Sequence, residues 1–101
     1  MSADLPGLAD LDRLIHEPAR LALTAILSVV DSADFLYLQR ETGLTKGNLS
    51  SHLAKLEEAG YIAIEKTYRG RIPLTLIRLT DKGAAAYKAY RARFKEFLEK
   101  S

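Results

Sequence analysis

The residues with the clearest chemical potential gather in one short stretch, TKGNLSSHLAK, which runs from Thr45 to Lys55. A serine beside a histidine, here Ser51 and His52, can suggest a nucleophile and its general base. Adjacent residues on a helix point about 100° apart, however, and no orienting acid or oxyanion loop accompanies this pair. Two isolated histidines, His16 and His52, rarely form a metal site, and the chain has no cysteine. We therefore expect no enzyme activity, no metal site and no cofactor, and we interpret His52 as a boundary residue or a phosphate contact.

The same stretch has the features of a helix that enters the major groove of DNA. Leu49, Leu53 and Leu56 fall on one arc of a helix and should face the core. The opposite arc is short and polar, which suits a groove about 12 Å wide, and its amide and hydroxyl groups can pair with base edges. A lysine in the first turn adds to the attraction of the helix dipole for phosphate. The alternative is an ordinary solvated face. The residues predicted to contact DNA from this helix are Thr45, Lys46, Gly47, Asn48, Ser50, Ser51 and Lys55.

A second group of cations follows in TYRGRIP, between two runs, YIAIEK and TLIRL, that are rich in β-branched and apolar residues. This pattern predicts a β-hairpin with a long basic tip, in which Gly70 is the turn residue and Pro73 is excluded from a central ladder position. A hairpin beside the helix could place its cations on phosphates or in the minor groove. The alternative is a tip that only improves solubility. The residues predicted to contact DNA from this hairpin are Lys66, Arg69, Gly70 and Arg71.

Capping residues and hydrophobic periodicity predict five helices, which span residues 8–16, 18–31, 35–42, 45–59 and 81–99. Asp34, Thr45 and Thr80 are suitable N-caps, and glycines at positions 43 and 60 suit helix ends. The helix over 18–31 starts at Pro18 and is apolar nearly all round, so it should be the buried central helix. Two helices joined by a short glycine-containing turn, here within residues 34–59, form a helix-turn-helix.

Length and charge limit the kind of molecule. A chain of 101 residues predicts a single domain, 1–101, with residues 1–7 as a loose tail. Residues 1–34 hold two Lys/Arg against six Asp/Glu, whereas the rest of the chain holds thirteen against seven, which fits a polyanion partner. The start has no signal-peptide pattern, and no apolar run approaches the roughly 20 residues that span a bilayer. We expect a cytoplasmic protein that has no membrane partner.

The last predicted helix carries aromatic residues at successive spacings of three, four and three, a coiled-coil-like seam. This seam is either core or dimer interface. A helix of about 19 residues spans about 28 Å, which exceeds what a small domain needs, so part of the seam should remain for a partner. We predict a homodimer. Its predicted interface residues are Leu8, Leu11, Leu14, Ile15, Tyr87, Tyr90, Phe94 and Phe97.

The run LQRETGLTKGNLSSHLAKLEEAGYI, followed by LTDKG, resembles the winged helix-turn-helix DNA-binding domains of prokaryotic transcriptional regulators in the MarR/ArsR-like group. HEPARLALTAIL is similar to the opening helix of ArsR-like members, and the resemblance covers about residues 14–90. It implies a mainly α fold with a small β-hairpin, built as a three-helix core, a wing over 61–79 and a C-terminal dimerisation helix. Within it, residues 45–59 would be the recognition helix and 66–73 the wing tip.

The predicted function is sequence-specific binding of double-stranded DNA for transcription regulation. The resemblance implies a homodimer on a palindromic operator, and repression is the commoner mode in similar families. The alternative is a winged-helix module for protein–protein interaction without specific DNA binding. A small-molecule effector stays open, because no pattern in the sequence supports one.

Overall fold

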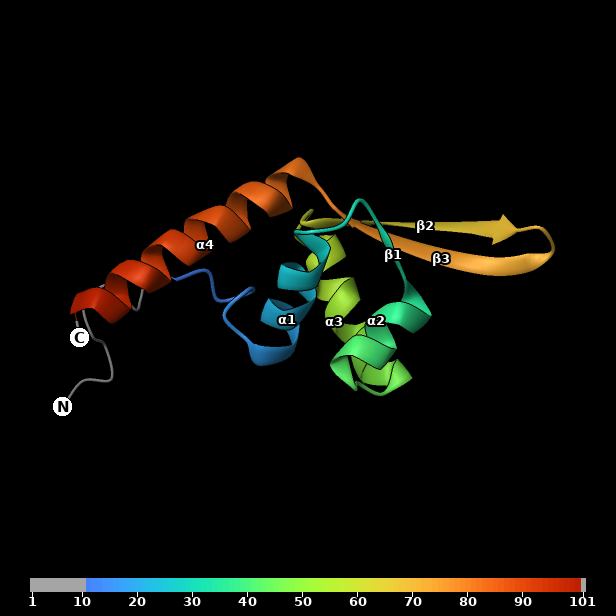
Figure 1. The fold of residues 1–101 in the computed structure, drawn as a ribbon, viewed down its shortest axis with the longest axis horizontal. Helices are drawn as coiled ribbons and strands as arrows, with labels where there is room; N and C mark the ends of the chain where they lie inside the picture. Colours follow the sequence, from blue (N-terminus) through green and yellow to red (C-terminus); the bar gives the residue numbers. More distant parts are fainter. Residues whose placement is uncertain (1–10, 101) are drawn as a thin grey trace.

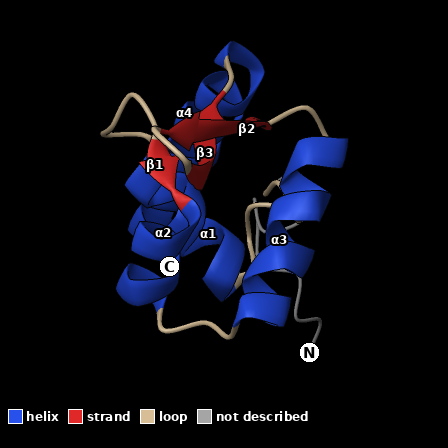
Figure 2. Ribbon diagram, turned by 90° about the vertical axis from the view of Figure 1, so that its right-hand side faces the viewer, coloured by secondary structure: helices blue, strands red, loops and turns tan. Residues whose placement is uncertain are grey.

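The structure, a computed structural model, describes residues 11–100, which form four helices and a three-stranded antiparallel sheet (Figure 1). The elements are α1 (Pro18–Leu27), β1 (Ala33–Asp34), α2 (Phe35–Thr42), α3 (Lys46–Glu58), β2 (Ile62–Arg69), β3 (Ile72–Leu79) and α4 (Asp81–Lys100). The sheet has the strand order β1-β3-β2 and lies against α1, α2 and α3 (Figure 2). The predicted winged helix-turn-helix fold, mainly α with a β-hairpin, is confirmed.

The three short helices and the sheet enclose the larger of two apolar clusters. Leu23 of α1, Leu38 of α2, Leu49 of α3 and Ile77 of β3 are all fully buried there. Each of these elements contributes one apolar face, so α3 is held by its leucines, with its other face left outside. A smaller cluster joins the segment before α1 to α4 through Leu11, Ile15 and Tyr90.

The helix ends follow the predicted capping residues. The side chains of Asp34, Thr45 and Thr80 each accept a hydrogen bond from the backbone amide three residues later, at 2.7, 3.1 and 3.0 Å. Gly43 ends α2 with a φ of +70°, in the left-handed region that favours glycine. The boundaries of α2 and α3 therefore agree with the prediction to within one residue.

The prediction of a helix over 8–16 was wrong. Residues 11–17 form turns and bends, and residues 8–10 lie outside the described part of the chain. Asp12 Oδ1 accepts hydrogen bonds from the backbone amides of Leu14 and Ile15, at 2.9 and 3.3 Å, and this local bonding competes with a helix. Glu17, which precedes Pro18, has an extended backbone with a φ of −148°, so a helix cannot continue through it into α1.

The central helix is also shorter than predicted, because α1 ends at Leu27 and not at residue 31. Ser28 closes it, with its hydroxyl donating to the carbonyl oxygen of Ala25 at 2.6 Å. Val29 and Val30, predicted to be buried, are 81% and 37% exposed. The chain has to leave the helix here because the next residues turn back to reach the sheet.

Long-range contacts explain a third strand that was not predicted and the position of Pro73, which was predicted to avoid a central ladder position. Ala33 and Asp34 pair with Ile77 and Leu76 as the short strand β1, so the sheet has three strands where a hairpin was expected. Pro73 lies on β3 beyond the residues that β1 pairs with, which leaves its second side open, as expected for proline.

Among residues 11–100, no helix is both long and apolar enough to cross a membrane. In the same part of the chain, no three His, Asp or Glu side chains come close enough together to hold a metal ion.

Candidate nucleic-acid interface

Helix α3 presents the short polar face that the sequence predicted. Its leucines Leu49, Leu53 and Leu56 are buried, whereas Gly47 and Ser51 on the opposite side are exposed. A Cβ added at Gly47 would have no atom within 4 Å. All seven residues predicted to contact DNA from this helix are exposed: Thr45, Lys46, Gly47, Asn48, Ser50, Ser51 and Lys55. Nothing in the described chain occludes this face.

The hydroxyl of Thr45 has a structural task. It accepts from the backbone amide of Asn48 at 3.1 Å, which satisfies one of the free amides of the first turn of α3. The remaining amides and the helix dipole make this end favourable for a phosphate, and Lys46 stands in the same turn. The first turn of α3 is therefore suited to contact a DNA phosphate, and the next turn is suited to contact DNA bases.

The wing is a regular two-stranded ribbon up to its tip. Strands β2 and β3 stay in register from Ile62↔Leu79 to Arg69↔Ile72, and only Gly70 and Arg71 form the turn. The basic tip is thus shorter than the predicted loop. Gly70 has a φ of +64°, and positive φ at the first turn residue alone is the pattern of a type II′ hairpin. The four predicted wing contacts, Lys66, Arg69, Gly70 and Arg71, are all exposed.

One open cleft, with a volume of about 570 Å³, joins the recognition helix to the wing. Lys46 and Ser50 line it from α3, and Lys66 and Arg69 line it from the wing. Four of the predicted DNA contacts from two distant parts of the sequence thus share one concave surface, on which three cations outnumber the carboxylate of Asp34. The other predicted contacts lie outside the cleft lining: Thr45 just before α3, Gly47, Asn48, Ser51 and Lys55 on α3, and Gly70 and Arg71 at the turn of the wing.

Helix α2 contributes to the cleft in a way that the sequence interpretation missed. Phe35, Leu36 and Gln39 line the cleft, and Leu36 is 65% exposed. Apolar residues on a short helix suggest core, so only the tertiary position of α2 reveals this role. Gln39 carried a usable signal, because an amide on a helix-turn-helix can pair with a base edge or a phosphate.

A small polar group fixes α3 against α1. His52 is half-buried, and its Nδ1 lies 3.1 Å from an Arg20 guanidinium nitrogen and 3.9 Å from Glu17 Oε1. Arg20 Nε also donates to the carbonyl oxygen of Leu14 at 2.6 Å. The hydrogen bond from the backbone amide of Arg20 is the main cause that lowers the pKa of Glu17. Burial acts in the opposite direction, and the nearby charges of His52 and Arg20 lower the pKa further. His52 is thus a boundary residue that orients α3.

The predicted dimer surface divides into buried and accessible parts. Leu11, Ile15 and Tyr90 pack inside the single chain, at 4%, 0% and 3% exposure, which corrects the expectation that they face a second subunit. Leu8 lies outside the described residues. Leu14, Tyr87, Phe94 and Phe97 are half-buried, and the rings of the two phenylalanines stack at 6.2 Å.

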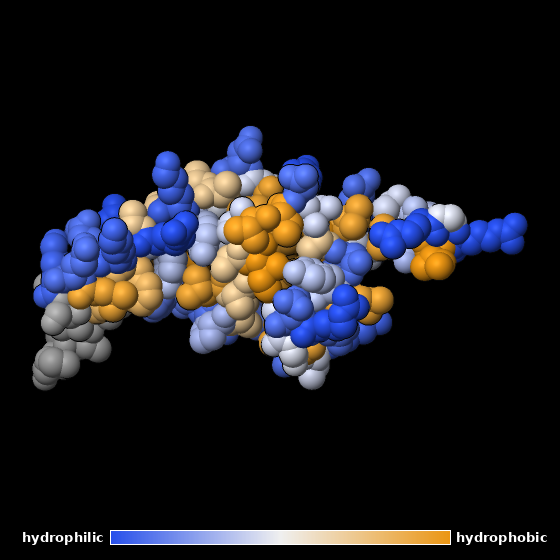
Figure 3. Space-filling view, viewed as in Figure 1, coloured by the Kyte–Doolittle hydropathy of each residue, from blue (hydrophilic) through white to orange (hydrophobic). Residues whose placement is uncertain are grey.

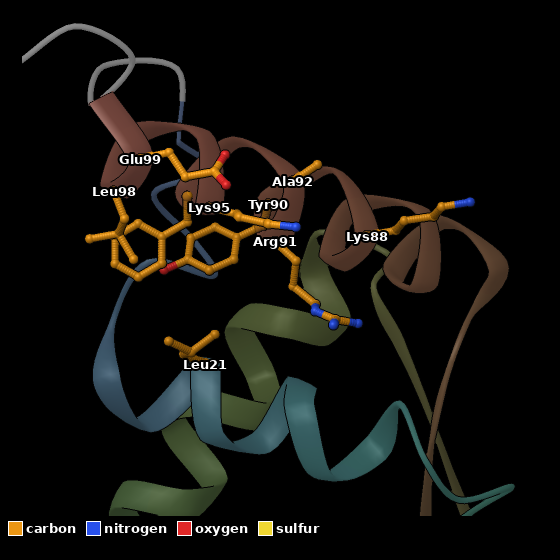
Figure 4. A pocket seen from close by; sticks show the side chains of 9 residues that line it. Leu21, Lys88, Tyr90, Arg91, Ala92, Lys95, Leu98 and Glu99 are labelled. Carbon is orange, nitrogen blue, oxygen red and sulfur yellow. The ribbon is translucent and has the colours of Figure 1, made fainter. Parts of the chain in front are cut away.

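A groove of about 640 Å³ runs between α4 and α1 next to this seam (Figure 4). Leu21 points from α1 toward Tyr90 and Leu98 on α4, and Lys88 points away from them. Leu21 and Leu98 were not among the predicted interface residues. Apolar side chains such as Leu21 and Leu98 thus line the groove together with charged side chains of α4.

Comparison with known proteins agrees with this geometry. Residues 19–98 match the family model described as a winged helix DNA-binding domain. An uncharacterised protein of Methanocaldococcus jannaschii is 37% identical over 79 residues, which cover 77% of this chain and 85% of that protein.

Two solved structures show the same arrangement. A transcriptional regulator homologue from Pyrococcus horikoshii OT3 is 28% identical and superimposes with a TM-score of 0.88 over 94% of this chain and 96% of that one. A structure described as a MarR-family transcriptional regulator from Enterococcus faecalis V583 is 23% identical, with a TM-score of 0.73 over 87% and 81% of the two chains. The predicted resemblance to winged-helix regulators is confirmed, and the family and fold are those of DNA-binding transcriptional regulators. The chain therefore belongs to the family of winged-helix DNA-binding domains.

Proposed function

We propose that this chain is a sequence-specific transcription repressor that binds a palindromic operator as a homodimer. The observation that carries the proposal is the shared cleft, which brings Lys46 and Ser50 of α3 together with Lys66 and Arg69 of the wing. Cations at both walls suit phosphates, while the exposed polar face of α3 beside them suits base edges.

A dimer gives this surface its specificity. Two recognition helices about 34 Å apart would occupy two major-groove half-sites on one side of the duplex, so the operator would be an inverted repeat. The similarity to a transcriptional regulator homologue over nearly the whole chain supports a role in regulation. Repression needs no more than occupancy of a promoter by a DNA-binding domain, and residues 19–98 match the model of such a domain.

The test begins with selection of bound fragments from genomic DNA, followed by gel shifts on the recovered site. We expect an inverted repeat. If each subunit neutralises three phosphates, log affinity should fall with log salt with a slope near −5. Placed in a promoter, the recovered site should lower the transcription of a reporter when the protein is present. Increased transcription of the reporter would contradict the repressor role but not the proposed DNA binding.

Matched arginine variants locate the contact. Arg69→Ala removes one cation per subunit from the cleft, so the salt slope should become shallower by about 2 for the dimer. Arg78 lies on β3 in a different surface hollow, together with Asp31 and Glu65, and Arg78→Ala should leave the slope unchanged. Equal effects of the two variants would argue against the cleft as the DNA site. If no DNA fragment is enriched, and any residual binding to DNA does not depend on salt, the alternative function would be favoured: a winged-helix module for protein–protein interaction.

A further inference from the structure

The wing tip combines exposed apolar side chains with cations. Ile72 is 68% exposed and Tyr68 is 69% exposed, and Arg69 and Arg71 stand beside them. Residues 68–73, YRGRIP, contain no acidic side chain. Figure 3 shows an apolar patch close to the hydrophilic end of the wing. A single exposed isoleucine is ordinary on a protein surface, so its position relative to the cleft decides its meaning.

Ile72 lies at the tip of the wing and is one of the residues that line the cleft of the proposed DNA site. Arg69 and Ile72 are the last cross-strand pair before the turn, so their side chains share one face of the ribbon. Both line the cleft with Lys46 and Ser50, as does Pro73. Tyr68, although equally exposed, does not line the cleft. Of the large exposed apolar side chains that line the cleft, Ile72 is therefore the one at the wing tip, whereas Leu36 lies on α2.

The wing is long enough to reach the neighbouring minor groove. Strand β1 pairs only with Leu76 and Ile77, so residues 66–69 and 72–75 form a free two-stranded ribbon (Figure 1). At about 3.4 Å per residue, four residues project roughly 13 Å. That distance is similar to the width of the major groove, about 12 Å, in which α3 would lie.

Entry into the minor groove requires a change in the DNA. The groove is about 6 Å wide, whereas two paired strands are about 4.8 Å apart before their side chains are counted. A tip that enters must therefore widen the groove. Cations at the tip can hold the phosphates on both sides, but an isoleucine between them finds an apolar surface only against sugars and base planes. An apolar wedge in the minor groove unstacks a base step and bends the duplex toward the major groove.

We infer that the wing tip bends DNA by inserting Ile72 as a wedge in the minor groove next to each major-groove half-site. This inference rests on the proposed DNA-binding function. It adds an activity, deformation of the operator, and a source of specificity at positions that no side chain reads directly. Pyrimidine–purine steps unstack most easily, so the operator should carry a TA or CA/TG step beneath each wing tip.

The test uses the intact chain and a duplex of about 40 base pairs that contains the selected site, with a fluorescence donor and acceptor at its ends. Saturating protein should bring the ends closer, as a bend of at least about 20° requires. The variant Ile72→Thr keeps the β-branched side chain that suits a strand but removes the apolar end, and its complex should be straighter. Tyr68→Ala, on the other face, should bend the duplex as the unmodified chain does.

A second readout separates wedging from bending by contact with the protein body. 2-Aminopurine placed in the step beneath the tip should brighten when the unmodified chain binds and stay dim with Ile72→Thr, because only an unstacked base loses its quenching. A straight duplex under the unmodified chain, or equal bending and brightening with Ile72→Thr, would overturn the inference while leaving the proposed function intact. Failure to bind any DNA would instead refute the proposed function and, with it, the wedge.

Discussion

Gly83 in the first turn of α4 lies against the backbone of Tyr61, where the chain turns from α3 into β2. An added Cβ would collide with the carbonyl oxygen of Tyr61 and lie 2.8 Å from its carbonyl carbon and 2.9 Å from Leu79 Cδ1. Backbone atoms cannot move aside as a flexible side chain can, so α4 would have to shift. We expect Gly83→Ala to lower the free energy of unfolding by about 3 kcal/mol, measured by urea unfolding.

Gly47 is the matched control, since it also lies on a helix but faces open space. Gly47→Ala should raise the free energy of unfolding by about 0.5 kcal/mol, because alanine favours a helix more than glycine does. If α3 approaches the bases closely, the same methyl group should weaken DNA binding. A variant that is more stable and binds equally well would show that this part of the helix stays away from the groove.

Tyr61 also gives the fold a pH dependence. Its hydroxyl donates to Asp12, and this hydrogen bond, with burial as a lesser cause, raises the pKa of Tyr61 to about 12. The folded state therefore holds the proton more tightly than the unfolded state, where the pKa is near 10. The stabilisation is complete below pH 10 and is lost as the pH rises toward about 12.

Comparison of Tyr61→Phe with the unmodified chain measures this effect. The difference in the free energy of unfolding between the two should be largest at about pH 8 and should shrink at about pH 11. The pKa of Tyr90 is also raised, first by burial, so Tyr90→Phe should show a pH dependence of the same sign without an aspartate partner. A difference that does not change with pH would mean that Tyr61 and Asp12 do not interact as described.

The N-cap of α3 carries a prediction at the scale of the element. Thr45→Ala removes the acceptor for the amide of Asn48 and should cost about 1 kcal/mol of stability. Because the first turn of α3 also faces the proposed phosphate, fraying should weaken DNA binding. Thr45→Ser should restore both properties. Thr80→Ala is the control, since it uncaps α4 and should reduce stability without a comparable loss of DNA affinity.

The elements also show how far the sequence could predict this fold. Helices α2 and α3 and the wing were predictable because their signals are local: a cap such as Thr45, a stop such as Gly43 and a change of period after Gly60. Strand β1 could not be predicted, because two residues form a strand only when β3 lies beside them. The turns at residues 11–17 could not be predicted either. Leucines at helical spacing can also pack through turns, and Asp12 stabilises the turns here.

The candidate site was predictable to a similar degree. The polar residues of α3 and the cations of the wing were identified from their types and spacing alone. The contribution of Leu36 and Ile72 could not be, because an apolar residue in a short helix or strand indicates burial unless its surroundings are known. The joining of α3 to the wing in one cleft depends on pairings between residues distant in the sequence.

At the scale of the whole molecule, α4 and the wing extend away from the body in opposite directions (Figure 1). The apolar groove along α4 is thus remote from the cleft at α3. A second copy could bind at α4 without covering the DNA-binding surface, which is the arrangement that a dimer on two half-sites requires.

Phe97→Glu tests that arrangement. A carboxylate in the seam should prevent dimerisation, so light scattering should give a mass near 11.2 kDa where the unmodified chain gives twice that value. The monomer would lose the second half-site, and its DNA affinity should fall by at least about 100-fold. Its salt slope should halve, from about −5.4 to about −2.7, because three phosphate contacts remain of six.

The control for this variant is Ala85→Glu, which introduces the same charge at an exposed position on the opposite side of α4 from Phe94. It should leave the mass, the affinity and the salt slope unchanged. The slope is the informative quantity, because misfolding of Phe97→Glu would abolish binding, whereas a folded monomer would bind weakly with half the salt dependence. A monomeric Phe97→Glu that keeps the full slope and affinity would show that one subunit makes all the contacts, and the palindromic operator would then have to be abandoned.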